Sequence, residues 1–168
     1  MERIVTILKG IKRPGMDNVI EYMRTSNYAA ASCYSHHKYK GGLVDHSLEV
    51  CDLMMERRGN LSEESVAICA FFHDLGKTKK AGVKLRGHHP KRSVAILDMC
   101  GFQLTNNERF AILQHHKVNY SYVTHPLRHC LSSSDMTSTG RWAMDHPVPN
   151  ETAFEQMKTA FLYAFSKL

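Results

Sequence analysis

The chain has 168 residues, a length that suits one domain with a single hydrophobic core. Its composition, 43% hydrophobic and 23% charged, is typical of a globular protein, and no run approaches the ~18 apolar residues of a membrane span, so we expect no membrane association. The net charge of +6 favours an anionic partner, which a phosphate-bearing small molecule or a nucleic acid would satisfy. The five cysteines are an odd number and contain no C-x-x-C pair, which excludes a disulfide framework and a thiolate zinc site.

The N-terminal segment has an acidic residue at position 2 and only about five apolar residues before Gly10, which is too short and wrongly flanked for a secretion signal. We therefore expect a cytoplasmic protein whose cysteines are small core residues. No feature of the sequence indicates an oligomeric state.

The middle of the chain has the apolar spacing of helices. Apolar residues at 43, 44, 48, 51, 54 and 55 predict an amphipathic helix over 43–57. A second helix should begin after Asn60 or Ser62, which are both good N-caps, and end near Gly76. A third is expected from Pro90 to Gly101, because proline is favoured in the first turn.

The rest of the chain is also predicted to be helical. A fourth helix should open with the capping box Thr105-x-x-Glu108, a fifth should cover 125–139, and a sixth should cover 152–168. The segment Lys77–Gly87 could form a small hairpin around Ala81-Gly82. There is no internal repeat or break in composition. We therefore predict an all-α bundle of about six or more helices, in a single domain over 1–168.

The eleven histidines are the most informative part of the composition, because several lie beside apolar helix faces. His46 follows Leu43 by three residues, and Asp135 continues the row of Leu127 and Leu131. A single histidine in such a place is usually an ordinary core or surface residue. Several buried imidazoles and carboxylates together need partners, and one shared divalent cation would satisfy them. The adjacent pair His73-Asp74 in "FFHDLGK" is the strongest local signal.

Five motifs occur in the order used by a known family: "HHKYKGGLVDHSLEV", "FFHDLGK", "GHHPKRSVAIL", "ILQHHK" and "LSSSDMTS", spanning residues 36–138. With them the chain resembles the HD superfamily of metal-dependent phosphohydrolases, which implies an HD-domain helical bundle. The resemblance implies that one metal ion is held by His46, His73, Asp74 and Asp135. The positions that match a second site in some branches are His89, His115 and His116. His89 is preferred to His88 because His89-Pro90, with Ser93 following, matches the family's His-Pro start.

Two branches of the superfamily share parts of this pattern. Residues 36–46 are similar to the entry of the HD module in bacterial 3'-to-5' exoribonucleases, but those enzymes carry an additional OB-type module for which this chain has no room, so processive RNA degradation is not expected. The "HHP" and "QHHK" pieces are similar to the branch that hydrolyses cyclic di-GMP. The Gly-Tyr-Pro element of that branch is replaced here by "VNYSY", which makes cyclic dinucleotide cleavage a minor option.

Histidine and carboxylate ligands suit one or two ions of Mn, Fe, Co, Ni or Zn, and the sequence does not choose among them. Asp74 and Lys77 are the candidate catalytic residues. Lys77 could stabilise charge on the phosphate oxygens, or it could be an ordinary lysine at a helix C-terminus. His37, Lys77, Lys79 and Lys80 are candidate substrate-binding residues, although a solvated basic loop and a surface histidine are equally ordinary interpretations.

These observations predict a hydrolase that cleaves a phosphate ester, as a phosphomonoesterase or phosphodiesterase, by means of metal-activated hydroxide. The expected substrate is a nucleotide or a short oligonucleotide. Two alternatives stay open: a regulatory or binding module that keeps its metal for structure, and a diiron oxygenase of the HD type.

Overall fold

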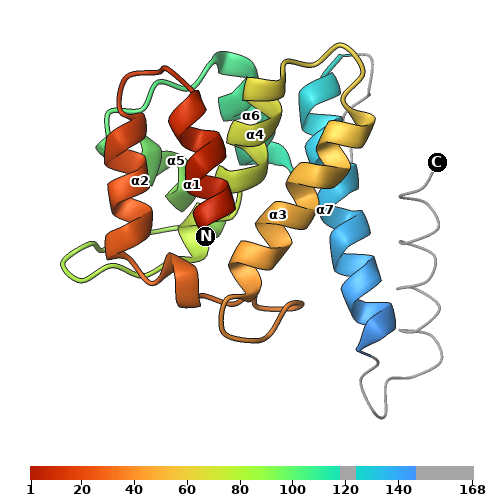
Figure 1. Cartoon of the computed structure of the whole chain (residues 1–168), viewed down its shortest axis with the longest axis horizontal. Coiled ribbons are helices and arrows are strands. Elements are labelled where there is room, and N and C mark those ends of the chain that lie inside the picture. The colour runs from red at the N-terminus through yellow and green to blue at the C-terminus, as the bar shows by residue number, and fades with distance from the viewer. Residues whose placement is uncertain (118–123, 147–168) are drawn as a thin grey trace.

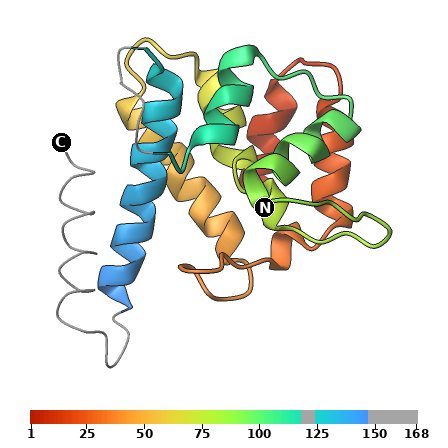
Figure 2. The same cartoon turned by 180° about the vertical axis from the view of Figure 1, so that it is seen from behind.

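The computed structural model describes residues 1–117 and 124–146. This part of the chain forms a bundle of seven α-helices and contains no β-strand, so the all-α prediction is confirmed (Figures 1 and 2). The elements are α1 (Glu2–Gly10), α2 (Met16–Thr25), α3 (Gly42–Arg57), α4 (Glu63–Phe72), α5 (His89–Met99), α6 (Asn106–Gln114), α7 (Pro126–Asp145) and the 3₁₀ turns η1 (Tyr28–Ala30) and η2 (Leu75–Lys77).

Helix α4 is the centre of the bundle. Its residues from Val66 to Phe72 are all buried, and a helix that is apolar on every side is stable only inside a core. It packs against α1, α3, α6 and α7 (Figure 1). The chain therefore brings the His73-Asp74 pair, which follows α4 directly, into the interior of the fold.

The two longest helices of the described residues, α3 and α7, lie side by side. Helix α3 packs against α7, and α7 also packs against α6, so residues from three distant parts of the sequence meet beside the end of α4 (Figures 1 and 2). Helix α5 packs against η2 directly after the His73-Asp74 pair. None of the helices within the described residues combines the length and the apolar character needed to cross a bilayer.

Local capping signals agree with the observed helix starts. The side chain of Ser62, not that of Asn60, accepts a hydrogen bond from the backbone of Ser65, and the capping box of Thr105 and Glu108 is formed. Helix α4 ends at Phe72, before the predicted stop near Gly76, because the chain tightens there into η2. Helix α7 continues to Asp145, beyond the predicted segment.

The hairpin predicted for Lys77–Gly87 is wrong. The segment forms a turn in which the amide of Val83 donates to the carbonyl of Lys80, but no strands pair around it. Val83 and Leu85 are the segment's only large apolar residues and are no more than partly shielded, so this segment has no apolar face with which to anchor a sheet to the core. The helix predicted over 152–168 lies outside the described residues.

Candidate metal centre

The turn after α4 is held against the start of α5 by one serine. Ser93 donates a hydrogen bond to the carbonyl of His73 and accepts one from the amide of Gly76, both at 2.8 Å. The two backbones are so close that a Cβ on Gly76 would lie 2.2 Å from the carbonyl oxygen of His89. This contact sets His89 beside Asp74, where its Nε2 lies 3.1 Å from Asp74 Oδ1.

The loop before α3 is packed equally tightly against that helix. A Cβ on Gly42 would lie 2.1 Å from the carbonyl oxygen of His37, and Gly41 has φ +91°, a conformation suited to glycine. Gly41-Gly42 thus permits a close backbone approach between this loop and α3. Both His36 and His37 are buried, and the ring of His36 stands edge-on to His46 with centroids 4.5 Å apart.

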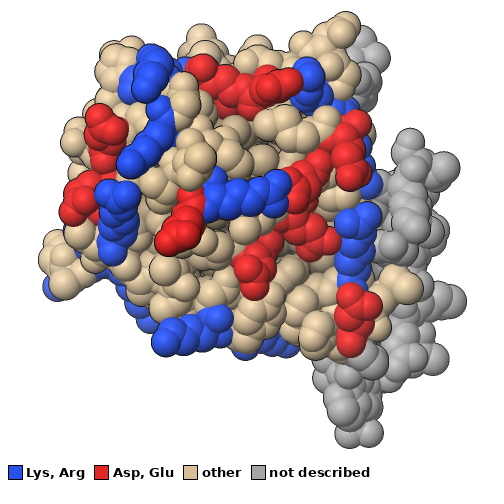
Figure 3. All heavy atoms as spheres, in the orientation of Figure 1, with Lys and Arg blue, Asp and Glu red and all other residues tan. Residues whose placement is uncertain are grey.

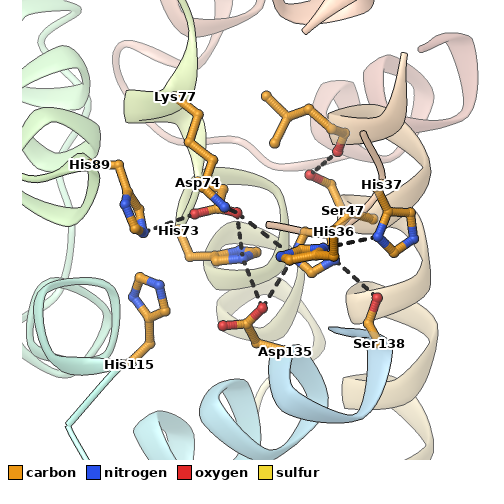
Figure 4. A network of polar contacts seen from close by, with 12 residues as sticks. His36, His37, Ser47, His73, Asp74, Lys77, His89, His115, Asp135 and Ser138 are labelled. Carbon is orange, nitrogen blue, oxygen red and sulfur yellow. Dashed lines mark hydrogen bonds and ion pairs between the residues drawn. The ribbon is translucent and has the colours of Figure 1, made fainter. Parts of the chain in front are cut away.

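Three helices contribute the first cluster of ligand-type side chains: His46 from α3, His73 from the end of α4 and Asp135 from α7 (Figure 4). The Nε2 atom of His46 lies 3.2 Å from Asp135 Oδ1, and that of His73 lies 3.9 Å from the same oxygen. Asp74 Oδ2 is 3.7 Å from His46 Nε2 and 3.5 Å from His73 Nε2. These four side chains converge on one point in the protein interior.

A second cluster consists of His89, His115 and His116. The Nε2 atoms of His89 and His116 are 2.9 Å apart. His115 links this cluster to the first one, because its ring centroid lies 5.1 Å from that of His73. Asp74 faces both clusters, because its Oδ2 is directed to the first and its Oδ1 to His89. This carboxylate therefore has the placement of a bridge. His88, by contrast, is exposed.

Hydrogen bonds at the far side of the rings determine which nitrogens face the centre. The Nδ1 atoms of His73 and His115 lie 2.9 and 2.7 Å from the carbonyl oxygens of Ala70 and Ile112. A carbonyl only accepts, so each Nδ1 carries the hydrogen and each Nε2 keeps its lone pair. These lone pairs point toward the carboxylates.

Loss of hydration favours the neutral form of four of these imidazoles. Desolvation lowers the pKa values of His73, His115 and His116, and it lowers the pKa of His89 to about 3. Neutral imidazole is the form that binds a metal ion. For Asp74, burial acts to raise the pKa, but the electrostatic interactions with His73 and Lys77 outweigh burial and lower the pKa, so this carboxylate is ionised.

Several atoms at the centre have no hydrogen-bond partner among residues 1–117 and 124–146. They are His46 Nε2, His73 Nε2, His115 Nε2 and Asp74 Oδ1, and all are buried. An unsatisfied buried polar atom costs about 1–3 kcal/mol, so four in one place require a common partner. A divalent cation fits this set of acceptors, and the two clusters could each hold a metal ion.

The lysines expected to bind substrate lie in different surroundings. Lys77 is paired with Asp74 at 2.5 Å and lines a pocket beside the centre. Lys80 instead donates to Thr25 at 2.7 Å, and its ammonium lies over the ring of Tyr22. Lys79 is exposed. Of these three lysines, Lys77 alone lies at the candidate site. Lys79 and Lys80 do not belong to the described residues that line the pocket.

This pocket has a volume of about 410 Å³. One wall contains the polar groups of the centre: His36, Lys77, His89, His116 and Asp135. The rest of the lining is formed by Met136, Thr139, Gly140 and Ala143 of α7, which also carries Asp135, together with Tyr34 and Ser35. His37 does not line the pocket, and its Nε2 instead lies 3.7 Å from Glu49. The pocket therefore combines charged groups with apolar side chains of α7.

Three residues near the centre were not selected from the sequence. Cys33 lies within 4.8 Å of ligand atoms of His36 and His46. Ser138 contacts His46, and Glu49 contacts Ser138. A spacing signal did exist for the last two, because Glu49 follows His46 by three residues and Ser138 follows Asp135 by three, which places each on the face of a predicted ligand.

The outer surface shows no concentration of one charge on the side seen in Figure 3, where basic and acidic side chains alternate. Exposed ion pairs among the described residues include Arg3–Asp52 and Arg58–Glu63. The net charge of +6 is therefore not gathered on that face.

In comparisons with known proteins, no family model, no curated protein and no solved structure matches this chain.

Proposed function

We propose that this protein is a metal-dependent phosphohydrolase of the HD type that acts on a nucleotide or a short oligonucleotide. The observation that carries the proposal is the convergence of the imidazoles of the two clusters, of which those of His46, His73 and His115 are buried, on ionised carboxylates beside a pocket, with Asp74 between the clusters. Two ions about 3.5–4 Å apart are the arrangement with which such donors serve phosphoryl transfer. Nitrogen and oxygen donors suit Mn, Fe, Co, Ni or Zn.

The proposed first ion would be held by His46, His73, Asp74 and Asp135. The proposed second ion would be held by His89, His115 and His116, and Asp74 lies beside both sets. When bound, such ions would lower the pKa of a water molecule and neutralise charge on a phosphoryl oxygen. The chain itself supplies the fixed geometry, the low-dielectric surroundings and neutral nitrogen donors.

Lys77 supports a phosphate-bearing substrate. Its ammonium is held by Asp74 at the pocket wall, so a phosphate bound beside Asp74 would meet a positive charge that is already oriented. The pocket volume of about 410 Å³ suits a small molecule. The apolar side chains of Met136 and Ala143 in the pocket lining offer a surface for a nucleobase, and this supports a nucleotide or the end of a short oligonucleotide.

The direct test is to incubate the Mn²⁺-loaded protein with nucleotides, cyclic nucleotides, short RNAs and simple phosphate esters, and to identify the products. We expect hydrolysis of at least one class and none after removal of the metal with a chelator. Bound metal without cleavage of any ester would contradict the proposal. Oxygen consumption by the iron-loaded form in place of hydrolysis would indicate an oxygenase.

The ligand assignment is tested by matched histidine variants. His89→Ala should lower metal content and activity, whereas His88→Ala should change neither, because His88 is exposed and adjacent in sequence. His73→Ala and Asp74→Ala should lose metal while the helical circular dichroism signal persists. Unchanged metal content in these variants, measured by elemental analysis, would refute the assignment.

A further inference from the structure

A chain of two hydrogen bonds connects the buried His46 to a partly exposed carboxylate. His46 Nδ1 lies 2.9 Å from Ser138 Oγ, and Ser138 Oγ donates to Glu49 Oε2 at 2.6 Å. His46 and Ser138 are fully buried, whereas the side chain of Glu49 is 28% exposed. Figure 4 shows Ser138 on α7 beside the imidazole cluster.

The direction of these hydrogen bonds follows from chemistry. An ionised carboxylate only accepts, so the single hydroxyl hydrogen of Ser138 is directed to Glu49. The serine oxygen is then left to accept from His46, so Nδ1 of His46 carries the hydrogen. Nε2 of His46 retains its lone pair and faces Asp135 at 3.2 Å.

Glu49 is held in the ionised form that this direction requires. Burial acts to raise its pKa, but contacts with His37, Ser138 and Arg141 outweigh burial and lower the pKa to about 2. The guanidinium of Arg141 donates to Glu49 Oε1 at 3.3 Å, so each carboxylate oxygen has its own partner.

His46 needs such a partner because of its position in the helix. His73 and His115 follow the last turns of α4 and α6, where free backbone carbonyls accept their Nδ1 hydrogens. His46 lies early in α3, where the carbonyl groups are already occupied by the helix itself. A side chain from another helix is the available substitute.

We propose that Ser138 and Glu49 are positioning residues that hold His46 in its Nδ1–H tautomer, so that its Nε2 lone pair is directed into the metal centre. The effect on metal binding rests on the proposed function, whereas the tautomer is a property of the metal-free protein. Outer partners of this kind commonly change metal affinity by about 10–100-fold when removed.

The test measures the tautomer and the metal affinity separately. In metal-free protein labelled with ¹⁵N-histidine, long-range ¹H–¹⁵N spectra should show His46 with a protonated Nδ1. Ser138→Ala should shift this signal to a mixture of tautomers and weaken Mn²⁺ binding by about 10–100-fold. Ser47→Ala is the matched control, because Ser47 is a buried serine next to His46 that bonds Tyr28 and the carbonyl of Leu43 instead.

Glu49 variants provide an independent measurement at a more exposed position. Glu49→Gln keeps an oxygen that accepts from Ser138, so the His46 tautomer should be retained. Glu49→Ala frees the serine hydroxyl to donate toward His46, so the signal should become mixed, whereas Glu56→Gln on the exposed side of α3 should have no effect.

Two results would overturn the proposal: a wild-type tautomer in both Ser138→Ala and Glu49→Ala, or unchanged Mn²⁺ affinity in Ser138→Ala while His46→Ala abolishes binding. Absence of Mn²⁺ binding by the wild-type protein would instead count against the proposed function, and the tautomer spectra would still decide the role of Ser138 and Glu49.

Discussion

Replacing Gly76 with alanine tests whether the close approach of η2 and α5 builds the candidate centre. The added Cβ would lie 2.2 Å from the carbonyl oxygen of His89 and 2.7 Å from the amide nitrogen of Ser93. Cβ atoms essentially never approach such atoms within 3.0 Å, so the two backbones would have to separate by at least about 0.8 Å. Neither neighbouring atom is the end of a flexible side chain that could move aside.

The size of the effect follows from this separation. Overpacking a core typically costs about 1–3 kcal/mol. A loss of about 2 kcal/mol lowers Tm by roughly 4–8 °C in a chain of this length. Ligand geometry is maintained to within about 0.5 Å in functional sites, so the same movement should displace His89 from Asp74 and weaken metal binding.

The assay compares Gly76→Ala with Gly10→Ala in thermal denaturation and in Mn²⁺ titration. Gly10 is exposed at the end of α1 and its added methyl would meet nothing within 4 Å, so Gly10→Ala should leave Tm unchanged or raise it. If Gly76→Ala kept both the wild-type Tm and the wild-type Mn²⁺ affinity, the reasoning from this contact would be refuted.

Two further perturbations probe other parts of the molecule. Glu108→Ala should lower the free energy of unfolding, measured in urea, by about 3 kcal/mol, because Arg13 donates to both oxygens of this buried carboxylate, at 2.7 and 3.0 Å. A free energy of unfolding equal to that of the wild type would contradict this role. Burial acts to raise the pKa of Glu108, but hydrogen bonds from Arg13 and Ser65 outweigh it and lower the pKa. The stabilisation by Glu108 should therefore be complete above pH 4.5, the pKa of an unperturbed glutamate, and should decline as the pH falls further. Urea unfolding of the wild type and the variant at a series of acidic pH values measures this decline. Lys77→Met should lower the turnover of a phosphate ester by a larger factor than it lowers the metal content, because Lys77 lines the pocket but is not a proposed metal ligand. If the variant had the wild-type turnover, the role of Lys77 would be limited to its ion pair with Asp74.

Features that depend on neighbouring residues were predictable from the sequence. The capping box of Thr105 and Glu108 is formed, because both partners lie within one helical turn. The apolar composition of 66–72 places α4 in the core, and the spacing of His46 places it on the inner side of α3. Helix positions and the inward direction of the ligand-type residues are local properties of a chain with this pattern.

Other features depend on contacts between distant segments. The orientation of Lys80 toward Thr25 and the absence of strands around Ala81-Gly82 follow from how the 78–88 segment meets the rest of the protein. The hydrogen bonds of Ser138 with His46 and Glu49 join residues about ninety positions apart. Periodicity could place each of these residues on a helix face, but it could not predict which faces would meet.

The sequence by itself determined a helical protein rich in inward-facing histidines and carboxylates, because helix formation and amphipathic spacing are encoded over a few turns. Only the tertiary structure decided that five separate helix segments bring those side chains within a few ångströms of one another, with Asp74 between two clusters. The physical reason is that ligand convergence depends on helix packing, and in this chain that packing depends on close backbone approaches at Gly42 and Gly76.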